Sequence, residues 1–275
     1  MRYILFHKTV IDYCNLLMGV RTSMEVTIFD NSVELGKSAA EASAAILNEQ
    51  IKLKGKARIV LSTGASQFTV VKALTEQKVD WSKVEMFHLD EYVNLPITHK
   101  ASFRKYLQER FVDLLPELKK AHFVNGDGDV RMNIEQLTKE IRKEPIDLAL
   151  IGIGENAHIA FNDPPANFET TEAFMLVNLD EACKLQQVRE GWFSSIDDVP
   201  DKAITMTVHQ ILQSKVIISC VPHKEKANAI KNFFENDTNR NIPATILKTH
   251  ANFTLYIDRE SASMTDEKHL TNLVE

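Results

Sequence analysis

Two acidic residues, Asp90 and Glu91, follow directly on the apolar run Val84–Leu89. The run has the length and composition of a buried strand, so both carboxylates stand at the strand's carboxyl end. A half-buried carboxylate has a raised pKa and can act as a general base at neutral pH. The alternative is that one of the two acids only caps the next segment, and the residues by themselves favour that simpler role.

A histidine follows a second apolar run. Residues Asp147–Ile153 lead into a glycine-rich turn, and His158 comes shortly after it. An imidazole with a pKa near 6.5 suits proton transfer at neutral pH, and Asp163 could orient or polarise it. A structural role for His158 is equally compatible with these residues. The turn does not have the dinucleotide-binding pattern, because Ala157 stands where the third glycine is expected.

A third segment, Ser62–Gln67, joins an apolar run to a stretch with helical spacing. Backbone N–H groups of a small-residue turn, a helix N-terminus and the hydroxyls of Thr63 and Ser66 would together suit a phosphate monoester. The segment is not a Walker A loop, because the Gly-Lys-Ser/Thr ending is missing. A plain turn with Ser66 as helix cap is the alternative, and the residues favour neither.

These segments depend on elements that the rest of the chain must supply. Strand-length apolar runs occur at Val26–Phe29, Arg58–Ser62, Val84–Leu89, Ile146–Ile153, Lys215–Val221 and Phe253–Ile257. Helical spacing occurs at Val33–Lys54, with Asn31 or Ser32 as cap, and at Gln67–Gln77, Lys100–Lys119, Asn133–Lys143 and His223–Asn236. The alternation predicts a single α/β domain with a Rossmann-like, mostly parallel sheet and helices on both faces. Ligands of such sheets bind beyond the carboxyl ends of the strands.

Composition limits the class of protein. The chain has 275 residues, a formal net charge of −6, 44% hydrophobic and 25% charged residues. These values exclude a wholly disordered chain and give no basic footprint for nucleic acid. Residues 1–24 are too polar to span a membrane and are expected to form an N-terminal extension to a domain over residues 25–275. Three distant cysteines predict neither a disulfide framework nor a zinc pair and favour the cytoplasm.

Together the three segments resemble the glucosamine-6-phosphate deaminases, also called isomerases, whose superfamily includes the 6-phosphogluconolactonases. The resemblance runs from about Glu25 to Ile257. It is carried by Phe-x-x-Asp-Glu-Tyr-Val-x-Leu-Pro at 87–96 and by Gly-x-Gly followed by His-Ile-Ala-Phe-Asn within 152–162. The Thr63-Gly64 loop and the stretch at 199–205 also fit. In this order and spacing the matches are specific.

The resemblance implies an enzyme that needs no cofactor and no metal. It implies conversion of glucosamine 6-phosphate, or a close epimer, to fructose 6-phosphate or its epimer with release of ammonia. We therefore expect an enzyme of amino sugar metabolism, classed as a hydrolase and an isomerase, that acts on a small-molecule sugar phosphate. No nucleic acid or membrane partner is expected, and the resemblance allows a monomer or a homo-oligomer.

The resemblance also implies roles for individual residues. Asp90 is similar to the base that moves a proton between C2 and C1, and His158 to the group that opens the sugar ring at O5. Glu91 is expected to support the site beside the base. Asn156 and Asp163 stand where the family usually has Asp and Glu. Asn156 can hold His158 by a hydrogen bond but cannot stabilise an imidazolium by charge.

The phosphate is expected at the turn and at two basic residues. The turn supplies Thr63, Gly64, Ala65 and Ser66, and Lys226 resembles the family's phosphate-binding lysine. Arg189 is the basic residue nearest to the family's phosphate arginine, although its position is offset by one; a surface arginine is the alternative.

Two other functions compete with the deaminase. One is a 6-phosphogluconolactonase-like or other sugar-phosphate enzyme, and the other is a sugar-phosphate sensor without turnover. Asn156 is the feature that supports a sensor. The acidic string at 90–92 and the string at 159–162 favour the deaminase.

Overall fold

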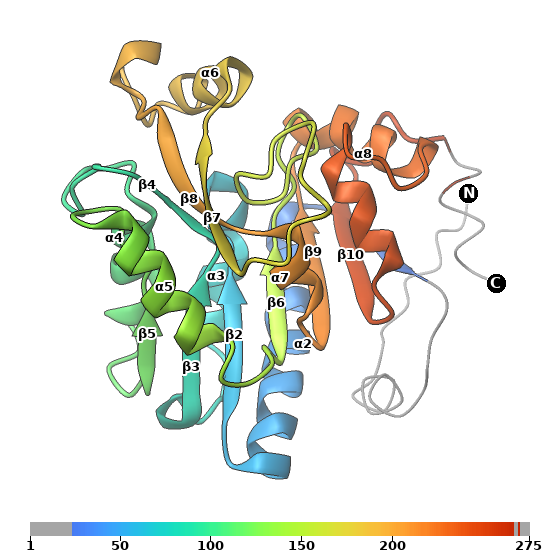
Figure 1. Cartoon of the computed structure of the whole chain (residues 1–275). Helices are drawn as coiled ribbons and strands as arrows, with labels where there is room; N and C mark the ends of the chain where they lie inside the picture. The colour runs from blue at the N-terminus through green and yellow to red at the C-terminus, as the bar shows by residue number, and fades with distance from the viewer. Residues whose placement is uncertain (1–23, 267–268, 270–275) are drawn as a thin grey trace.

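The six apolar runs of the sequence all form strands of one parallel sheet. The computed structural model describes residues 24–266 and 269, so the predicted extension lies, apart from Met24, outside the described residues. The strands lie in the order β1 (Glu25–Phe29), β10 (Phe253–Asp258), β9 (Val216–Val221), β6 (Leu148–Ile151), β2 (Ala57–Leu61), β3 (Val84–His88) and β5 (Lys120–His122) (Figure 1). Strand β5 was not predicted, because it has only three residues and begins with an exposed lysine.

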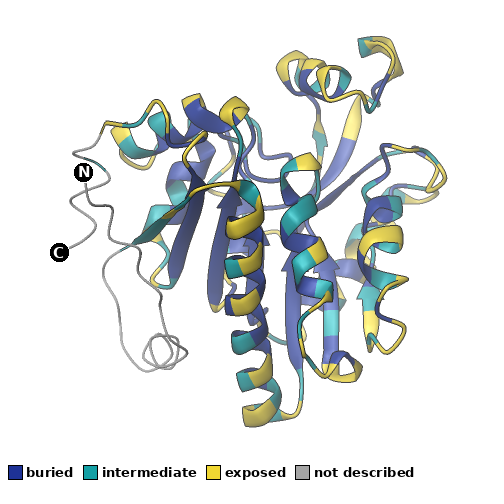
Figure 2. Ribbon diagram, turned by 180° about the vertical axis from the view of Figure 1, so that it is seen from behind, coloured by how far each residue is buried: buried dark blue, intermediate teal, exposed yellow. Residues whose placement is uncertain are grey.

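Helices cover both faces of this sheet, which confirms the predicted fold class. The helices α2 (Ser32–Lys54) and α3 (Phe68–Thr75) pack on one face, and α5 (Val130–Ile141) and α8 (Ala227–Glu235) pack on the other (Figures 1 and 2). Every residue of β2, β6 and β9 is buried. Strands that are covered on both sides read as continuous apolar runs, and the sequence therefore located them.

The predicted first helix begins and ends where its sequence signals lie. The Asn31 side chain accepts hydrogen bonds from the backbone N–H groups of Val33 and Glu34, which caps α2. The helix ends at Gly55, whose φ of 77° is in the left-handed region that glycine favours. The apolar, Ala-rich face of α2 lies against α3 and the sheet.

The helix predicted over Lys100–Lys119 is wrong in its extent. Helix α4 covers only Phe103–Leu107, and a π-helical turn over Gln108–Val112 follows it. Ser102 caps the start of α4 by accepting a hydrogen bond from the backbone N–H of Lys105. Pro116 disfavours the α conformation at the residue before it, so the helix cannot continue to Lys119.

A second, antiparallel sheet is absent from the sequence prediction. It has the order β4 (Asp90–Tyr92), β8 (Lys202–Met206) and β7 (Phe174–Asn178). The connection from β7 to β8 contains α6 (Glu181–Arg189), which projects at the top of Figure 1. Strand β7 alternates between more and less buried residues, so it has no continuous apolar run that would reveal it.

A buried ion pair ties the start of this second sheet to α4. The fully buried Glu91 carboxylate accepts hydrogen bonds from Ser102 Oγ at 2.7 Å and from the Arg104 backbone N–H at 2.9 Å. Arg104 Nε lies 3.1 Å from Glu91 Oε2, and its Nη2 lies 3.0 Å from Asp127 Oδ2. The polar turn that the sequence shows at 125–129 is thereby joined to the strand end at Glu91.

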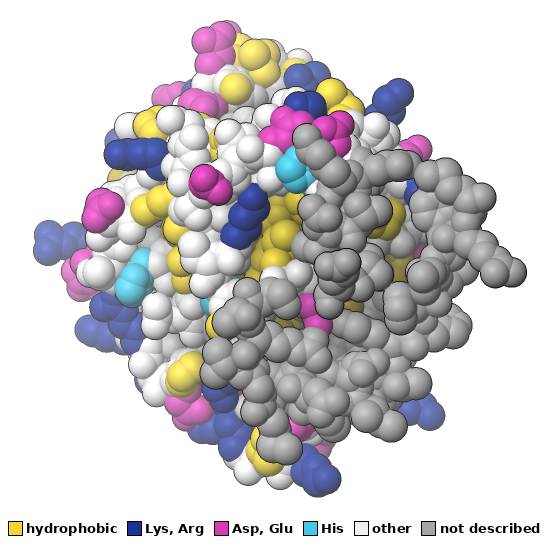
Figure 3. All heavy atoms as spheres, turned by 90° about the vertical axis from the view of Figure 1, so that its right-hand side faces the viewer, with side chains coloured by type: hydrophobic (Ala, Val, Ile, Leu, Met, Phe, Trp, Pro, Cys, Tyr) yellow, Lys and Arg dark blue, Asp and Glu magenta, His cyan; other side chains and the backbone are white. Residues whose placement is uncertain are grey.

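The side of the molecule seen in Figure 3 mixes both signs of charge. Lys and Arg side chains are interspersed with Asp and Glu side chains over the coloured part of this face, in keeping with the small net charge. Within the described residues, no helix is long and apolar enough to cross a membrane.

We expect Glu91→Gln to destabilise the fold by about 3 kcal/mol, because it leaves the buried Arg104 guanidinium without its buried charge partner. Urea unfolding at neutral pH measures this change. Glu109→Gln is the matched control, since Glu109 pairs with Lys105 at 3.8 Å on the exposed surface. The control should change stability by less than about 0.5 kcal/mol. Equal effects of the two substitutions would contradict the role given to the buried pair.

Candidate active site

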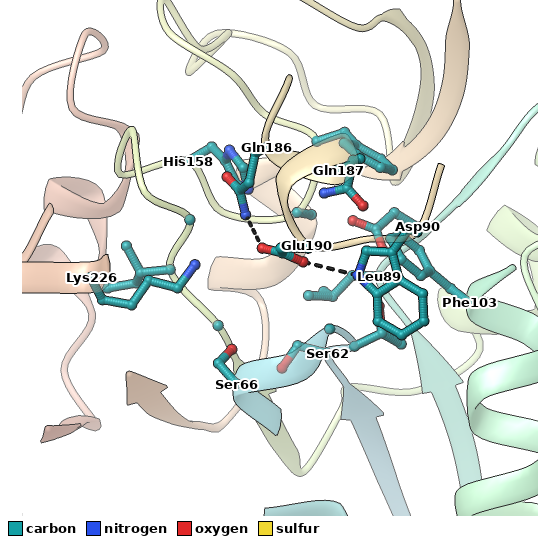
Figure 4. Close-up of a pocket in the computed structure, with 18 residues that line it drawn as sticks. Ser62, Ser66, Leu89, Asp90, Phe103, His158, Gln186, Gln187, Glu190 and Lys226 are labelled. Carbon is teal, nitrogen blue, oxygen red and sulfur yellow. Dashed lines mark hydrogen bonds between the residues drawn. The ribbon is translucent and has the colours of Figure 1, made fainter. Parts of the chain in front are cut away.

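One pocket lies where the carboxyl ends of β2, β3, β6 and β9 meet α6 (Figure 4). Six residues that the sequence analysis singled out line it, and they come from four separate segments of the chain: Thr63, Gly64, Ser66, Asp90, His158 and Lys226. The apolar part of the lining includes Leu89, Phe103 and Phe161. The sheet therefore brings the three predicted segments to a single site.

The turn after β2 presents hydroxyl groups to one end of the pocket. Gly64 has a φ of 100°, which lets the backbone turn sharply before the 3-10 helix Ala65–Gln67. Ser62 and Ser66 both line the pocket, and the buried Ser62 Oγ has no hydrogen-bond partner among the described residues. Ala65 is exposed and does not line the pocket. The turn thus offers hydroxyls and backbone N–H groups to an anion.

Lys226 brings a positive charge to the same pocket. It ends the 3-10 turn after β9, and its side chain is almost fully buried. Burial lowers its pKa, and the carboxylates of Glu190 and Glu155 oppose only part of that effect. Asp258 holds the preceding turn by accepting hydrogen bonds from the His223 backbone N–H. A buried ammonium of this kind gains from an anionic ligand beside it.

Asp90 is the buried carboxylate of the pocket. Only 6% of the residue is exposed, and it opens β4 opposite Thr205 of β8. Burial raises its pKa well above the ordinary value, and the negative charges of Glu91 and Asp163 raise it further. A carboxyl group with a raised pKa in a pocket is suited to take up and release a proton near neutral pH.

His158 is held by a small polar cluster on the other side of the pocket. Its Nδ1 lies 3.0 Å from Asp163 Oδ1. Asn156 donates to the same oxygen of Asp163 at 3.2 Å and accepts from the His158 backbone N–H at 3.1 Å. Burial opposes ionisation of Asp163, but its contacts with His158 and Asn156 outweigh burial and lower its pKa. Asn156 therefore holds the backbone and the acid rather than the imidazole ring itself.

A glycine makes room for the imidazole. A Cβ on Gly154 would lie 2.2 Å from His158 Nε2 and 2.3 Å from its Cε1. The ring therefore lies directly over the Gly154 backbone, with its Nδ1 side toward Asp163. The second glycine of the sequence motif is thus explained by close packing against the histidine.

Glu91 and Arg189, like Ala65, Asn156 and Asp163, are predicted site residues that do not line the pocket. Glu91 turns its carboxylate toward Ser102 and Arg104, as described above, so it acts on the site through its charge near Asp90 and not by contact with the pocket. Arg189 is largely exposed, and its guanidinium pairs with the Glu155 carboxylate. Of the two basic residues, Lys226 lines the pocket and Arg189 does not.

Helix α6 and the residues after it add pocket groups that were not predicted. These are Gln186, Gln187, Glu190 and Trp192. Phe193, which follows Trp192, is buried in an apolar cluster with Tyr92 and Phe161. The polar spacing of α6 gives no signal for these roles, because only the tertiary packing of the helix over the pocket creates them.

Known proteins resemble this chain in sequence over most of its length. A family model described as glucosamine-6-phosphate isomerases/6-phosphogluconolactonase matches residues 30–256. A protein of Bacillus cereus (strain B4264) named glucosamine-6-phosphate deaminase is 32% identical over 236 residues, which are 86% of this chain and 88% of that protein. A protein of the same name from Bacillus thuringiensis (strain Al Hakam) is 33% identical with the same coverage.

Solved structures resemble the fold over most of the chain. The structure of a monomeric glucosamine-6-phosphate deaminase has a TM-score of 0.79 and 29% identity, and the match covers 88% of this chain and 100% of that one. A 6-phosphogluconolactonase from Shewanella baltica OS155 has a TM-score of 0.71 at 19% identity and covers 87% and 100%. At that identity the second match bears on the fold alone.

We expect Asp90→Asn to stabilise the unliganded protein more at pH 8 than at pH 4. The pKa of Asp90 is raised by folding, so between about 4 and the folded-state pKa the native protein keeps a proton that the unfolded chain releases. Stability therefore falls as pH rises through that range, by about 1.4 kcal/mol for each unit of the shift. Asparagine does not ionise, so the variant does not lose this stability as the pH rises.

Urea unfolding at the two pH values measures the effect of Asp90→Asn. Asp197→Asn serves as the control, because Asp197 is exposed in the loop after α6. A stabilisation by Asp90→Asn that is equal at pH 4 and pH 8 would contradict the raised pKa.

Proposed function

The chain belongs to the family of glucosamine-6-phosphate isomerases and 6-phosphogluconolactonases, and we propose that it is a glucosamine-6-phosphate deaminase. It converts glucosamine 6-phosphate, or a close epimer, to the ketose 6-phosphate and ammonia. One observation carries the proposal: a buried carboxylate with a raised pKa, Asp90, shares a pocket with an anion site of one lysine and several hydroxyls. An aldose–ketose proton transfer on a phosphorylated sugar requires both.

The phosphate end of the substrate is bound by the turn after β2 and by Lys226. Thr63, Ser66 and the backbone N–H groups of the turn provide donors, and the Lys226 ammonium provides the charge. Ser62 Oγ, which has no partner among the described residues, is a further donor. Binding energy from the phosphate then orients the distant reacting carbons against Asp90.

His158 opens the sugar ring by exchanging a proton with O5. Asp163 faces its Nδ1, which leaves Nε2 as the nitrogen that meets the substrate. Asp163 also stabilises the imidazolium by charge, which is the role that Asn156 cannot perform. Asparagine at 156 therefore does not deprive the histidine of a carboxylate partner.

Asp90 moves the proton between C2 and C1 of the opened sugar. It removes the proton from C2 while the substrate ammonium gives a proton to the C1 oxygen, which yields an enolamine. Asp90 then returns its proton to C1, so the C2 amine becomes a protonated imine. Water adds to the imine carbon, and the C–N bond breaks to give the ketone and ammonia. The raised pKa makes Asp90 basic enough to take the proton and acidic enough to return it.

The expected hydrolase class is corrected by the comparisons. That class points to lactone hydrolysis, which is the activity named for solved structures of 13–19% identity, and these bear on the fold alone. The relatives at 32–33% identity are named deaminases. A buried Asp90 close to other negative charges lowers the stability of the fold. A sensor without turnover would gain nothing in return for this loss.

We further propose that one chain forms a complete site. The pocket of this chain holds a buried carboxylate, a histidine and a lysine, and a similar solved structure is that of a monomeric deaminase. A homo-oligomer is compatible with this arrangement. We also propose a reducing cytoplasm as the compartment, because Cys183 and Cys220 are free and buried.

We expect the purified protein to release ammonia and ketose phosphate in equal amounts from glucosamine 6-phosphate or galactosamine 6-phosphate. Asp90→Asn should lower ammonia release and exchange of the C2 proton with deuterated solvent by about a hundredfold or more, because the base is lost. It should still bind the sugar phosphate, as measured by calorimetry. Near-normal turnover by Asp90→Asn would remove the base role, and binding without ammonia release by the wild type would favour a sensor.

We expect Lys226→Ala to raise KM by about tenfold or more and to change kcat by less than about threefold, because it removes a charge-assisted contact with the phosphate. Steady-state kinetics separates the two parameters. Lys224→Ala is the matched control, since Lys224 belongs to the same turn but is exposed. A loss confined to kcat would contradict a phosphate contact in the ground state.

A further inference from the structure

Glu190 places a carboxylate in the pocket that no step of the proposed reaction uses. It directly follows α6 and lines the pocket with Gln186 and Trp192. Gln186 Nε2 donates to its Oε1 at 2.7 Å, and Trp192 Nε1 donates to its Oε2 at 3.0 Å (Figure 4). Two donors on two different oxygens fix the orientation of the carboxylate.

The Glu190 carboxylate does not hold α6 on the domain. Both of its donors belong to the same short segment of the chain as Glu190 itself. The helix is instead tied to the domain by the hydrogen bond from Tyr92 Oη to Gln187 Oε1, at 2.9 Å, and by the Arg189–Glu155 ion pair. The carboxylate is therefore available to a ligand.

The position of Glu190 identifies the part of the ligand that it meets. In Figure 4 its carboxylate lies between Lys226, at the phosphate end, and Asp90, at the reacting end. Its charge acts on Lys226, which lines the pocket, and on the buried Tyr92 phenol. A hexose 6-phosphate with its phosphate at Lys226 and its C1–C2 at Asp90 turns its middle carbons toward Glu190.

Carboxylate chemistry suits hydroxyl groups at that place. An ionised carboxylate accepts about four hydrogen bonds, and the protein fills one site on each oxygen. A phosphate dianion would be repelled there, whereas neutral hydroxyls donate to the remaining sites. We propose that Glu190 is a specificity-determining residue that accepts hydrogen bonds from the C3 and C4 hydroxyls of the substrate. The inference rests on the proposed function.

This arrangement separates the 4-epimers of the hexosamine phosphates. The hydroxyl at C4 points to opposite sides in glucosamine and galactosamine, so only one epimer can present it to a fixed carboxylate. Sites that hydrogen-bond a substrate hydroxyl discriminate strongly, because a misplaced hydroxyl leaves a polar group of the site unpaired. Glu190 then selects the epimer, while Lys226 and Asp90 bind and convert either one.

The test compares kcat/KM for glucosamine 6-phosphate and galactosamine 6-phosphate in four proteins: wild type, Glu190→Gln, Glu190→Ala and the control Glu181→Gln. Glu181 is exposed in the first turn of α6, and the substitution removes one negative charge, as Glu190→Gln does. We expect the wild type to prefer one epimer by at least about tenfold, and Glu190→Ala to reduce that preference at least about tenfold. Glu190→Gln should retain part of it, because an amide oxygen still accepts, and the control should leave it unchanged.

Inhibition by inorganic phosphate and the melting temperature are measured on the same proteins. In Glu190→Gln the phosphate inhibition constant should stay within about threefold of wild type, which separates loss of hydroxyl recognition from damage to the phosphate end. A wild-type preference near one, or the same preference in Glu190→Ala, overturns the inference while ammonia release leaves the proposed function standing. No ammonia from either substrate with wild type overturns the proposed function and this inference with it.

Discussion

Asp90 and Glu91 are adjacent carboxylates that one short strand sends to opposite sides, and the site depends on that separation. Successive side chains of a strand alternate between its faces. Glu91 goes to the side of Ser102 and Arg104, where an ion pair and several hydrogen bonds satisfy its charge. Asp90 goes into the pocket, where Glu91 and Asp163 repel its charge. The same strand therefore produces one inert carboxylate and one with a raised pKa.

The charges of the pocket form a pattern that a sugar phosphate completes. Lys226 is buried, so its ammonium gains most from a second charge that arrives with the ligand. The carboxyl of Asp90 is also buried, and its basicity comes from burial and from the negative charges of Glu91 and Asp163. A cation next to Asp90 would lower the pKa of its carboxyl group, so Lys226 and Asp90 have to lie apart in the pocket. The lysine follows β9 and the acid follows β3, with β6 and β2 between them in the sheet.

Sequence reasoning located the strands that form continuous apolar runs and missed strands that are short or carry mixed patterns. The continuous apolar strands and their carboxyl ends were predicted, and Asp90 and His158 were found because each lies close after such a strand, whereas the family resemblance pointed to Lys226. Strand β7 and the helix α6 carry mixed patterns, so the roles of Gln187 and Glu190 depend on long-range packing that spacing does not encode. Glu91 was predicted in the site because it follows Asp90 in the sequence. Neighbouring residues of a strand point to opposite faces, so Glu91 lies outside the pocket.

Strand β4 also connects the candidate base to α6. Asp90 and Tyr92 are two residues apart and so lie on the same face of the strand. Tyr92 packs against Phe103, Phe161 and Phe193 and donates its hydroxyl hydrogen to Gln187 of α6. Phe103 and Phe161 also line the pocket, so the aromatic cluster forms both the support of the helix and a wall of the site. Helix α6 and the strand that carries Asp90 are therefore joined by the aromatic cluster on one face of the strand, and the buried Glu91–Arg104 pair holds its other face.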